Sequence, residues 1–303
     1  MRFLILCLFF AFAFANAYEV IGANNSLEAV QGAKSAAVGG AALALDEDLP
    51  SLASNPLQLA ELAKLSLALT HVSYFEGTSY NGTVMAVPLT NAGALGFAAS
   101  RFGAGDIPHI REGDPLPDGG NYNTLDISDW IFTSAWGMSF GKWNLALSVH
   151  LLKRELDQSG WGFRSDVAAG YEFSKRAAVA AMVKGWTSSS VRWESGYFEY
   201  SNPELYAAFR FSEPFPYFYG KLNLYWQSAS IFETDRLLAS SAGLEFETNF
   251  RFSLRAGLTE VKDTKSLALG AGIKPVSWLF ADYAFQMHEI LSSVHRISII
   301  ASF

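Results

Sequence analysis

From Lys64 onward the chain repeats one pattern, in which apolar and polar side chains alternate along segments of about ten residues. A period of two indicates a β-strand with two unlike faces, and about ten residues cross a bilayer at a slant. The pattern predicts an all-β fold, a transmembrane antiparallel β-barrel of about 14 strands over residues 64–303. The predicted strands are Lys64–Phe75, Tyr80–Leu89, Ala94–Gly103, Ser128–Phe140, Trp143–Leu156, Phe163–Ser174, Ala177–Thr187, Tyr200–Ser212, Pro216–Ser228, Leu238–Thr248, Phe250–Thr259, Thr264–Lys274, Ser277–Glu289 and Ser293–Phe303.

The connections between these segments alternate in length, as the periplasmic turns and outer loops of outer-membrane barrels do. The short ones are Thr90–Gly93, Gly141-Lys142, Lys175-Arg176, Glu213–Phe215, Asn249 and Pro275-Val276. Most of the others are longer, namely Glu76–Ser79, Ala104–Ile127, Asp157–Gly162, Ser188–Glu199, Ala229–Arg236, Glu260–Asp263 and Ile290–Ser292. This order predicts that both ends of the barrel sequence lie on the periplasmic side.

The last segment ends on an aromatic residue, Phe303. His295, Ile297, Ile299, Ala301 and Phe303 share one face of an extended chain, and more of the polar groups lie on the other. A final strand of this kind resembles the C-terminal signal of bacterial outer-membrane barrels, with Phe303 as its last residue.

The N-terminus predicts a secretory signal peptide over residues 1–17, cleaved after Ala17. Arg2 precedes an apolar run that is too short to span a membrane as a helix, and Ala15-Asn16-Ala17 fits the cleavage pattern. Cys7 lies inside the apolar run, which argues against a lipoprotein site. Because Cys7 is the one cysteine, the mature chain has no disulfide and no cysteine-based metal site.

Composition agrees with a barrel that faces lipid outside and water inside. Half of the residues are hydrophobic and 17% are charged, against about a quarter charged in soluble domains. The net charge of −7 becomes −8 without Arg2, so nucleic acid is not an expected partner. The expected surroundings are outer-membrane lipid, in the outer membrane of a Gram-negative-type bacterium. A soluble secreted β-protein is the remaining structural alternative.

Residues 18–63 do not alternate and are expected to form a short plug-like segment of helix or tight loops inside the barrel mouth. The alternative is a flexible periplasmic arm. The acidic run Asp46-Glu47-Asp48 is interpreted as a solvated turn rather than a Ca²⁺ site. The loop Ala104–Ile127 either contacts a partner or covers the lumen.

A lumenal charge cluster is predicted across one hairpin. Glu245 and Glu247 alternate with outward Leu244 and Phe246, and Arg251 and Arg255 alternate with outward apolar residues on the next strand. These four are expected to pair across the strands inside the barrel, although a role in selectivity is an alternative.

No motif for enzymatic chemistry is visible, so we expect no enzyme and no cofactor. The histidines, at 71, 109, 150, 288 and 295, show no metal-binding spacing, and there is no nucleophile elbow or phosphate-binding glycine loop. A barrel hydrolase would need a serine and a histidine brought together by the fold, which the sequence neither shows nor excludes.

Residues 32–59 carry a family resemblance. Gly32-Ala33, Gly39-Gly40, the acids Asp46 and Asp48, and Asn55-Pro56 resemble the N-terminal block of the PorV/PorQ barrel proteins, with the FadL-type transporters as wider relatives. The resemblance implies a structural role for Gly32, Ala33, Gly39, Gly40, Asn55 and Pro56.

It also implies a non-enzymatic outer-membrane protein. The PorV/PorQ branch would make it an accessory of type IX-like protein secretion, with secretion-machinery or cargo proteins as partners. The short chain favours this branch. The alternative is a FadL-like transporter or pore for hydrophobic small molecules.

Overall fold

The computed structural model describes residues 25–28, 32–75, 77–109, 123–156, 158–231, 237–261, 264–288 and 292–303. The predicted signal peptide, residues 1–17, lies outside them. Among the residues described, no helix is long and apolar enough to cross a membrane.

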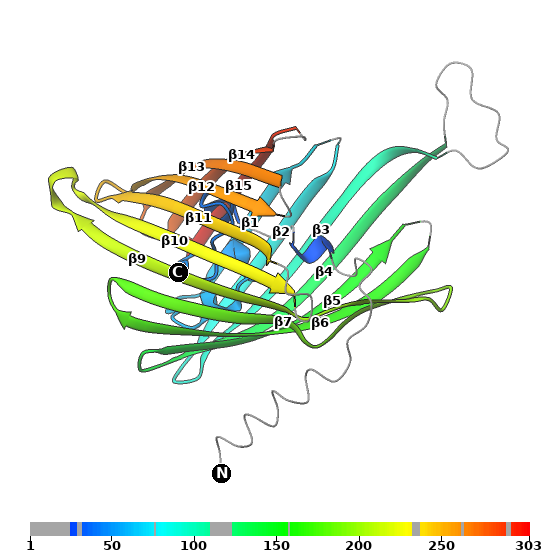
Figure 1. Ribbon diagram of the computed structural model, residues 1–303, viewed down its shortest axis with the longest axis horizontal. Helices are drawn as coiled ribbons and strands as arrows, with labels where there is room; N and C mark the ends of the chain where they lie inside the picture. The colour runs from blue at the N-terminus through cyan, green and yellow to red at the C-terminus, as the bar shows by residue number, and fades with distance from the viewer. Residues whose placement is uncertain are drawn as a thin grey trace, which may run out of the picture.

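The chain forms a closed antiparallel barrel with 14 strand positions, as the alternating segments predict. The strands are β1 (Ser66–Ser73), β2 (Ser79–Leu89), β3 (Gly93–His109), β4 (Asn123–Phe140), β5 (Trp143–Glu155), β6 (Ser159–Ser174), β7 (Ala177–Trp193), β8 (Phe198–Ser201), β9 (Glu204–Phe215), β10 (Gly220–Ile231), β11 (Leu237–Thr248), β12 (Phe252–Val261), β13 (Thr264–Val276), β14 (Leu279–His288) and β15 (Val294–Ser302). Consecutive strands pair except for β8 and β9, and the pairing of β1 with β15 closes the barrel (Figure 1). The strands β8 and β9 occupy one position, because both pair with β7.

The two faces of the wall follow the alternation in the sequence. Along β15, Val294, Arg296 and Ser298 are buried on the inner face, while Ile297 and Ile299 are exposed on the outer face. Apolar side chains facing outward are what a lipid environment requires. At the end of the strand the Phe303 N–H donates to the Leu65 carbonyl at 2.8 Å, and the ring stacks on Trp278.

Several predicted connections are wrong in extent. Strand β3 continues to His109, and β4 begins at Asn123. The two strands pair again beyond a register shift, so strand pairing includes much of the predicted loop Ala104–Ile127. Asp106 adopts a positive φ there, and its N–H donates to Asp126, which lets the ladder resume. Residues 110–122 lie outside the described part. The predicted loop Ser188–Glu199 likewise contains the β7–β8 hairpin.

Two predicted turns are displaced. Residues 213–215 belong to β9, and the turn is a 3-10 helix, η3 (Pro216–Phe218). Residues 249–251 form a turn before β12, so the predicted strand starts at Phe252 rather than Phe250. At the second turn the alternation of apolar and polar residues continues in the sequence, so its boundary was not visible there.

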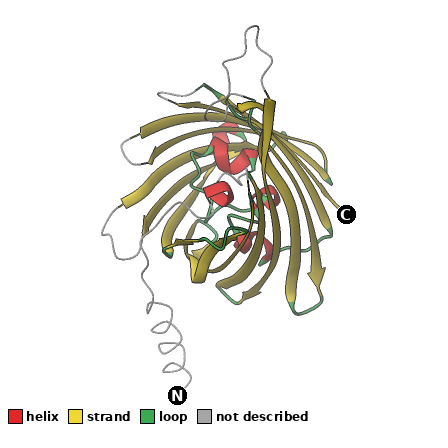
Figure 2. Ribbon diagram, turned by 90° about the vertical axis from the view of Figure 1, so that its right-hand side faces the viewer, coloured by secondary structure: helices red, strands yellow, loops and turns green. Residues whose placement is uncertain are grey.

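The described residues before β1 form four short helices, and Figure 2 shows helices enclosed by the strands. They are α2 (Asn25–Glu28), α3 (Ala33–Ala37), η1 (Leu49–Ser51) and η2 (Pro56–Leu59). We call residues 32–63 the inner segment. Its helix α3 packs on β12–β15, η1 on β1, β2 and β15, and η2 on β3–β6. The inner segment therefore contacts opposite sides of the barrel wall.

Candidate ligand-binding cavity

The inner segment approaches the barrel wall at backbone distance. Its helix α3 has the sequence Ala-Lys-Ser-Ala-Ala, whose three alanines favour helix and allow close packing. Gly39 adopts φ +70°, and its carbonyl accepts a hydrogen bond from Thr259. A Cβ built on Gly257 of the wall would lie 2.0 Å from the Gly39 nitrogen, so a side chain has no room there.

The motif residues of the sequence all lie in this packed region. The Gly32 N–H donates to Ser51 Oγ at 2.7 Å, and the Ala33 N–H donates to Ser298 Oγ on β15 at 3.0 Å. Gly40 adopts φ +77° in the turn after α3. These contacts fix the start of the inner segment to the wall.

Asn55 and Pro56 hold the second half of the segment. Asn55 Nδ2 donates to the carbonyls of Ala42 and Leu43 at 2.9 and 3.3 Å, and its Oδ1 accepts from the Leu57 N–H at 3.1 Å. Pro56 opens η2, where its missing N–H is not needed. The pair therefore joins two parts of the segment that the sequence separates.

A second link inside the segment is the buried carboxyl of Asp48. It accepts hydrogen bonds from the backbone and hydroxyl of Ser35 and, at 2.6 Å, from Ser51 Oγ. Burial raises the pKa of Asp48 above its ordinary value, although the hydroxyls of Ser35 and Ser51 oppose the shift. Asp48 is thus a structural anchor rather than the solvated turn residue that its acidic run predicted.

The predicted charge cluster is partly assembled. Glu245 is fully buried and accepts from Arg255 Nε at 2.7 Å and from Tyr225 Oη at 2.7 Å. Glu247 lies nearer the turn and pairs with Lys221 at 3.2 Å. Placing Arg251 in the cluster was wrong: it lies exposed in the turn and donates to the Pro275 carbonyl.

Two members of the cluster were missed in the sequence. Arg255 Nη1 also donates to Asp282 of β14 at 2.5 Å, and Lys34 Nζ lies 3.7 Å from Glu245. Burial alone would lower the pKa of Lys34, but Glu245 raises it above the ordinary value, so the ammonium stays charged. The four groups form a buried network of two cations and two anions that joins α3 to β11, β12 and β14.

A second buried network lies on β4–β6. His150 Nε2 is 3.0 Å from both Ser148 Oγ and Asp166 Oδ2, and Nδ1 is 2.9 Å from Thr133 Oγ1. In a hydrolase triad the serine and the carboxylate bind opposite ring nitrogens. Here both bind the same one, and His150 is fully buried, so the arrangement does not meet the geometry of the hydrolase alternative.

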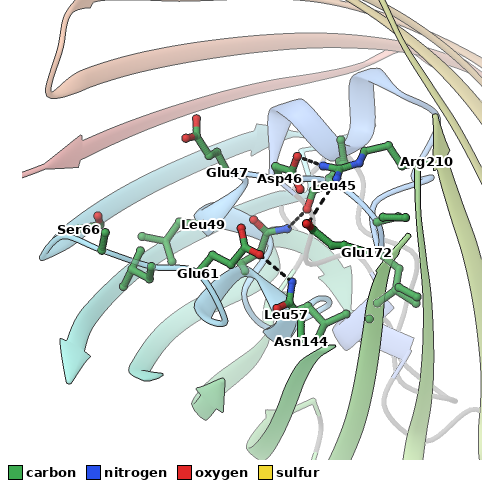
Figure 3. A pocket seen from close by; sticks show the side chains of 18 of the residues that line it. Leu45, Asp46, Glu47, Leu49, Leu57, Glu61, Ser66, Asn144, Glu172 and Arg210 are labelled. Atoms are coloured by element: carbon green, nitrogen blue, oxygen red, sulfur yellow. Dashed lines mark hydrogen bonds and ion pairs between the residues drawn. The ribbon is translucent and has the colours of Figure 1, made fainter. Parts of the chain in front are cut away.

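Between the inner segment and the wall lies a cavity of about 530 Å³ (Figure 3). Its apolar lining includes Leu43, Leu45, Leu49, Leu57, Val179 and Ile300. Other lining residues, such as Glu172, Ser277 and Ser302, lie beside the tight turns, the end that faces the periplasm in outer-membrane barrels. The volume is typical of sites for small organic ligands.

Charged groups gather at one part of this cavity. Figure 3 shows Arg210 directed toward Asp46 of the inner segment and Glu172 of β6, with ion pairs to both. Arg210 Nε is buried and has no hydrogen-bond partner among the described residues. Asn144 donates to Glu61 at 3.1 Å on another part of the lining. The cavity lining therefore combines apolar side chains with seven charged residues, among them Asp46, Glu172 and Arg210.

Comparison with known proteins identifies solved structures that share the fold of this chain. No protein-family model matches the chain, and no curated protein does. Solved structures match along nearly the whole chain. The toluene transporter TbuX of Ralstonia pickettii is 14% identical, with a TM-score of 0.58 over 90% of this chain and 98% of that one. The monoaromatic hydrocarbon channel CymD is 13% identical, with a TM-score of 0.56 over 95% and 99%. The toluene transporter TodX of Pseudomonas putida is 13% identical, with a TM-score of 0.56 over 89% and 96%.

This is an outer-membrane barrel fold. Sequence identities of 13–14% show a shared fold and no more. These three structures are described as two transporters and a channel rather than as enzymes. The resemblance to the PorV/PorQ proteins gains no support from these matches and remains an expectation from residues 32–59.

Proposed function

We propose that the protein transports a hydrophobic small molecule across the outer membrane, with the cavity as its binding site on the periplasmic side. The observation that carries the proposal is a cavity of about 530 Å³ between the inner segment and the wall, whose lining includes Leu43, Leu45, Leu49 and Leu57. An apolar solute gains free energy on leaving water for such a lining. The similarity to hydrocarbon transporters supports the choice of class.

The inner segment has two roles in this proposal. It supplies one side of the cavity, through Leu43, Leu45 and Leu57, and it occupies space that an open porin would leave to water. The contacts through Asn55 and the network around Glu245 hold it in place. In this proposal the hydrophobic solute moves from one set of apolar side chains to the next, rather than diffusing through a wide water-filled channel.

The test is uptake of a labelled monoaromatic hydrocarbon, at low external concentration, by a strain that lacks the gene. We expect slower uptake, restored by the wild-type gene but not by Leu57→Trp, which fills the cavity. Leu67→Trp is the matched control, because Leu67 is 42% exposed on the outer face of β1. Equal uptake with and without the gene would reject the proposal.

A second candidate function is the secretion-accessory role of the PorV/PorQ type. It is favoured by the motif in residues 32–59, and by the long hairpin of β3 and β4, which extends from the barrel in Figure 1 and offers a contact surface. Mass spectrometry of secreted and surface proteins in the same deletion strain tests it. Loss of a defined set of these proteins, with normal hydrocarbon uptake, would replace the transport proposal by this one.

A further inference from the structure

A row of alternating cations and aromatic rings crosses the outer surface of β3–β8. Each member is the register partner of the next across the strand pairs. We call it the outer row, and its members are Arg101, Trp130, Lys153, Trp161, Arg192 and Phe198. Neither the cavity nor the inner segment involves these residues.

The side chains of the outer row point away from the lumen. Trp161 is 58% exposed and Phe198 43%, and the Lys153 side chain is 37% exposed. The guanidinium of Arg192 lies over the Phe198 ring at 5.5 Å from its centroid. A cation–π contact of this kind positions the Arg192 guanidinium on the outer surface.

Lys153, near the middle of the outer row, lies where the apolar band of the barrel ends. Lys153 is ten residues along β5 from Trp143, which sits at a tight turn. With a rise of about 3.4 Å per residue and a tilt of about 40°, this separation is about 26 Å along the barrel axis, close to the height of the apolar band. Because the strands tilt, the row climbs outward from Arg101 to Arg192.

The neighbouring row on the membrane side is apolar. Phe132, Leu151 and Phe163 are register partners there, and all three are exposed. Trp130 stacks on Phe132 with ring centroids 6.3 Å apart, so the two rows form one continuous surface. This surface matches a phosphorylated lipid, because its cations lie at the headgroup level and its apolar side chains lie at the level of the acyl chains.

The charge of the outer row favours an anionic partner. It holds three cations in a chain with a net charge of −7. Glu155 forms an ion pair with Lys153 at 2.5 Å and also attracts Arg101, so the three cations and Glu155 together carry a net charge of +2. Successive cations are two strands apart, or about 10 Å, a spacing that suits separate phosphate groups.

The geometry points to the outer row as a binding site for a phosphorylated lipid of the outer leaflet. Arg101, Lys153 and Arg192 contact the phosphate groups, and the acyl chains lie against Phe132, Leu151 and Phe163. An arginine donates several N–H groups to a phosphate, which makes this pairing strong at a membrane boundary. A partner of another class, such as an acidic protein, would not require the apolar row.

The test uses the purified protein in phosphatidylcholine nanodiscs, titrated with bis-phosphorylated lipid A and read by native mass spectrometry. The variant is Arg101→Gln, Lys153→Gln and Arg192→Gln together. Each basic residue at an anionic membrane surface contributes about fivefold in affinity, so the triple variant is expected to bind about 100-fold more weakly. Dephosphorylated lipid A should bind the wild type as weakly as bis-phosphorylated lipid A binds the triple variant.

The matched control removes three cations at the tight turns: Lys142→Gln, Lys175→Gln and Arg251→Gln. It should bind lipid A like the wild type. A conservative variant, Arg101→Lys with Arg192→Lys, should keep most of the affinity, which separates lost charge from lost folding. Unchanged binding by the triple glutamine variant, or equal binding of dephosphorylated lipid by the wild type, would overturn the inference.

Discussion

Glu245→Gln should loosen the inner segment without opening the barrel. The Glu245 carboxylate lies 3.7 Å from Lys34 Nζ, and Lys34 is the charged group that α3 brings to the network. Coulomb's law with an effective dielectric constant of about 20 gives about 4 kcal/mol for such a pair. Lys34 keeps its hydrogen bond to the Asp46 carbonyl, at 2.8 Å, and the attraction of Asp282. We therefore expect a loss of about 3 kcal/mol in the free energy of local opening.

Hydrogen exchange measures this loss directly. A change of about 3 kcal/mol is roughly a 150-fold increase in the opening equilibrium, so the amides of Ala33–Ala37 should exchange about that much faster. Amides in β1 and β15, which close the barrel, should keep their rates. Glu247→Gln is the matched control, because Glu247 pairs with Lys221 near the turn and attracts Lys34 less strongly than Glu245 does. Unchanged exchange in Glu245→Gln, or equal acceleration in both variants, would refute the assignment of this network as the anchor.

Three further predictions concern the same segment. Gly257→Ala should expose the inner segment to protease, because its Cβ would lie 2.0 Å from the Gly39 nitrogen; Gly170→Ala, with 3.5 Å to its nearest neighbour, should not. Asn55→Ala should lower the free energy of opening of the segment by about 2 kcal/mol, measured by hydrogen exchange, since the buried carbonyls of Ala42 and Leu43 lose their donor. Asp48→Asn should stabilise the segment at neutral pH, measured by proteolysis. The folded-state pKa of Asp48 lies above its ordinary value of 3.8, so ionisation of Asp48 opposes folding as pH rises. The stabilisation by Asp48→Asn should therefore disappear as pH falls below 3.8, where the carboxyl is protonated in both states. A constant advantage across this range would contradict the linkage.

The barrel could be predicted from the sequence because its signal is repeated. Each strand is a weak signal, but alternation at Val294–Ile299 and in the other segments agrees with alternating short and long connections. Pairing of Glu245 with Arg255 followed from the same rule, since register partners on one face must meet across a hairpin. Where alternation continues into a turn, the rule fails, and Arg251 was placed inside the barrel for that reason.

The cavity could not be predicted in the same way. Lys34 meets Glu245 only because the inner segment folds back into the lumen, and no local pattern encodes a contact between residues so far apart. One usable signal was missed: Gly243 and Gly257 are register partners within strands, and glycine in a strand interior marks a close approach of another backbone. The ion pairs of Arg210 with Asp46 and Glu172 also join residues far apart in the sequence, so no local pattern could predict them.

The central claim is that the cavity holds an apolar small molecule. The most direct test is a crystal structure of the protein soaked with 4-bromotoluene, in which the anomalous signal of bromine locates the ligand. We expect a bromine peak between the inner segment and the wall, beside Leu43 and Leu57, and no peak there in Leu57→Trp. A bromine peak elsewhere in the barrel, or no peak inside it at saturating ligand, would show that the cavity does not bind apolar small molecules.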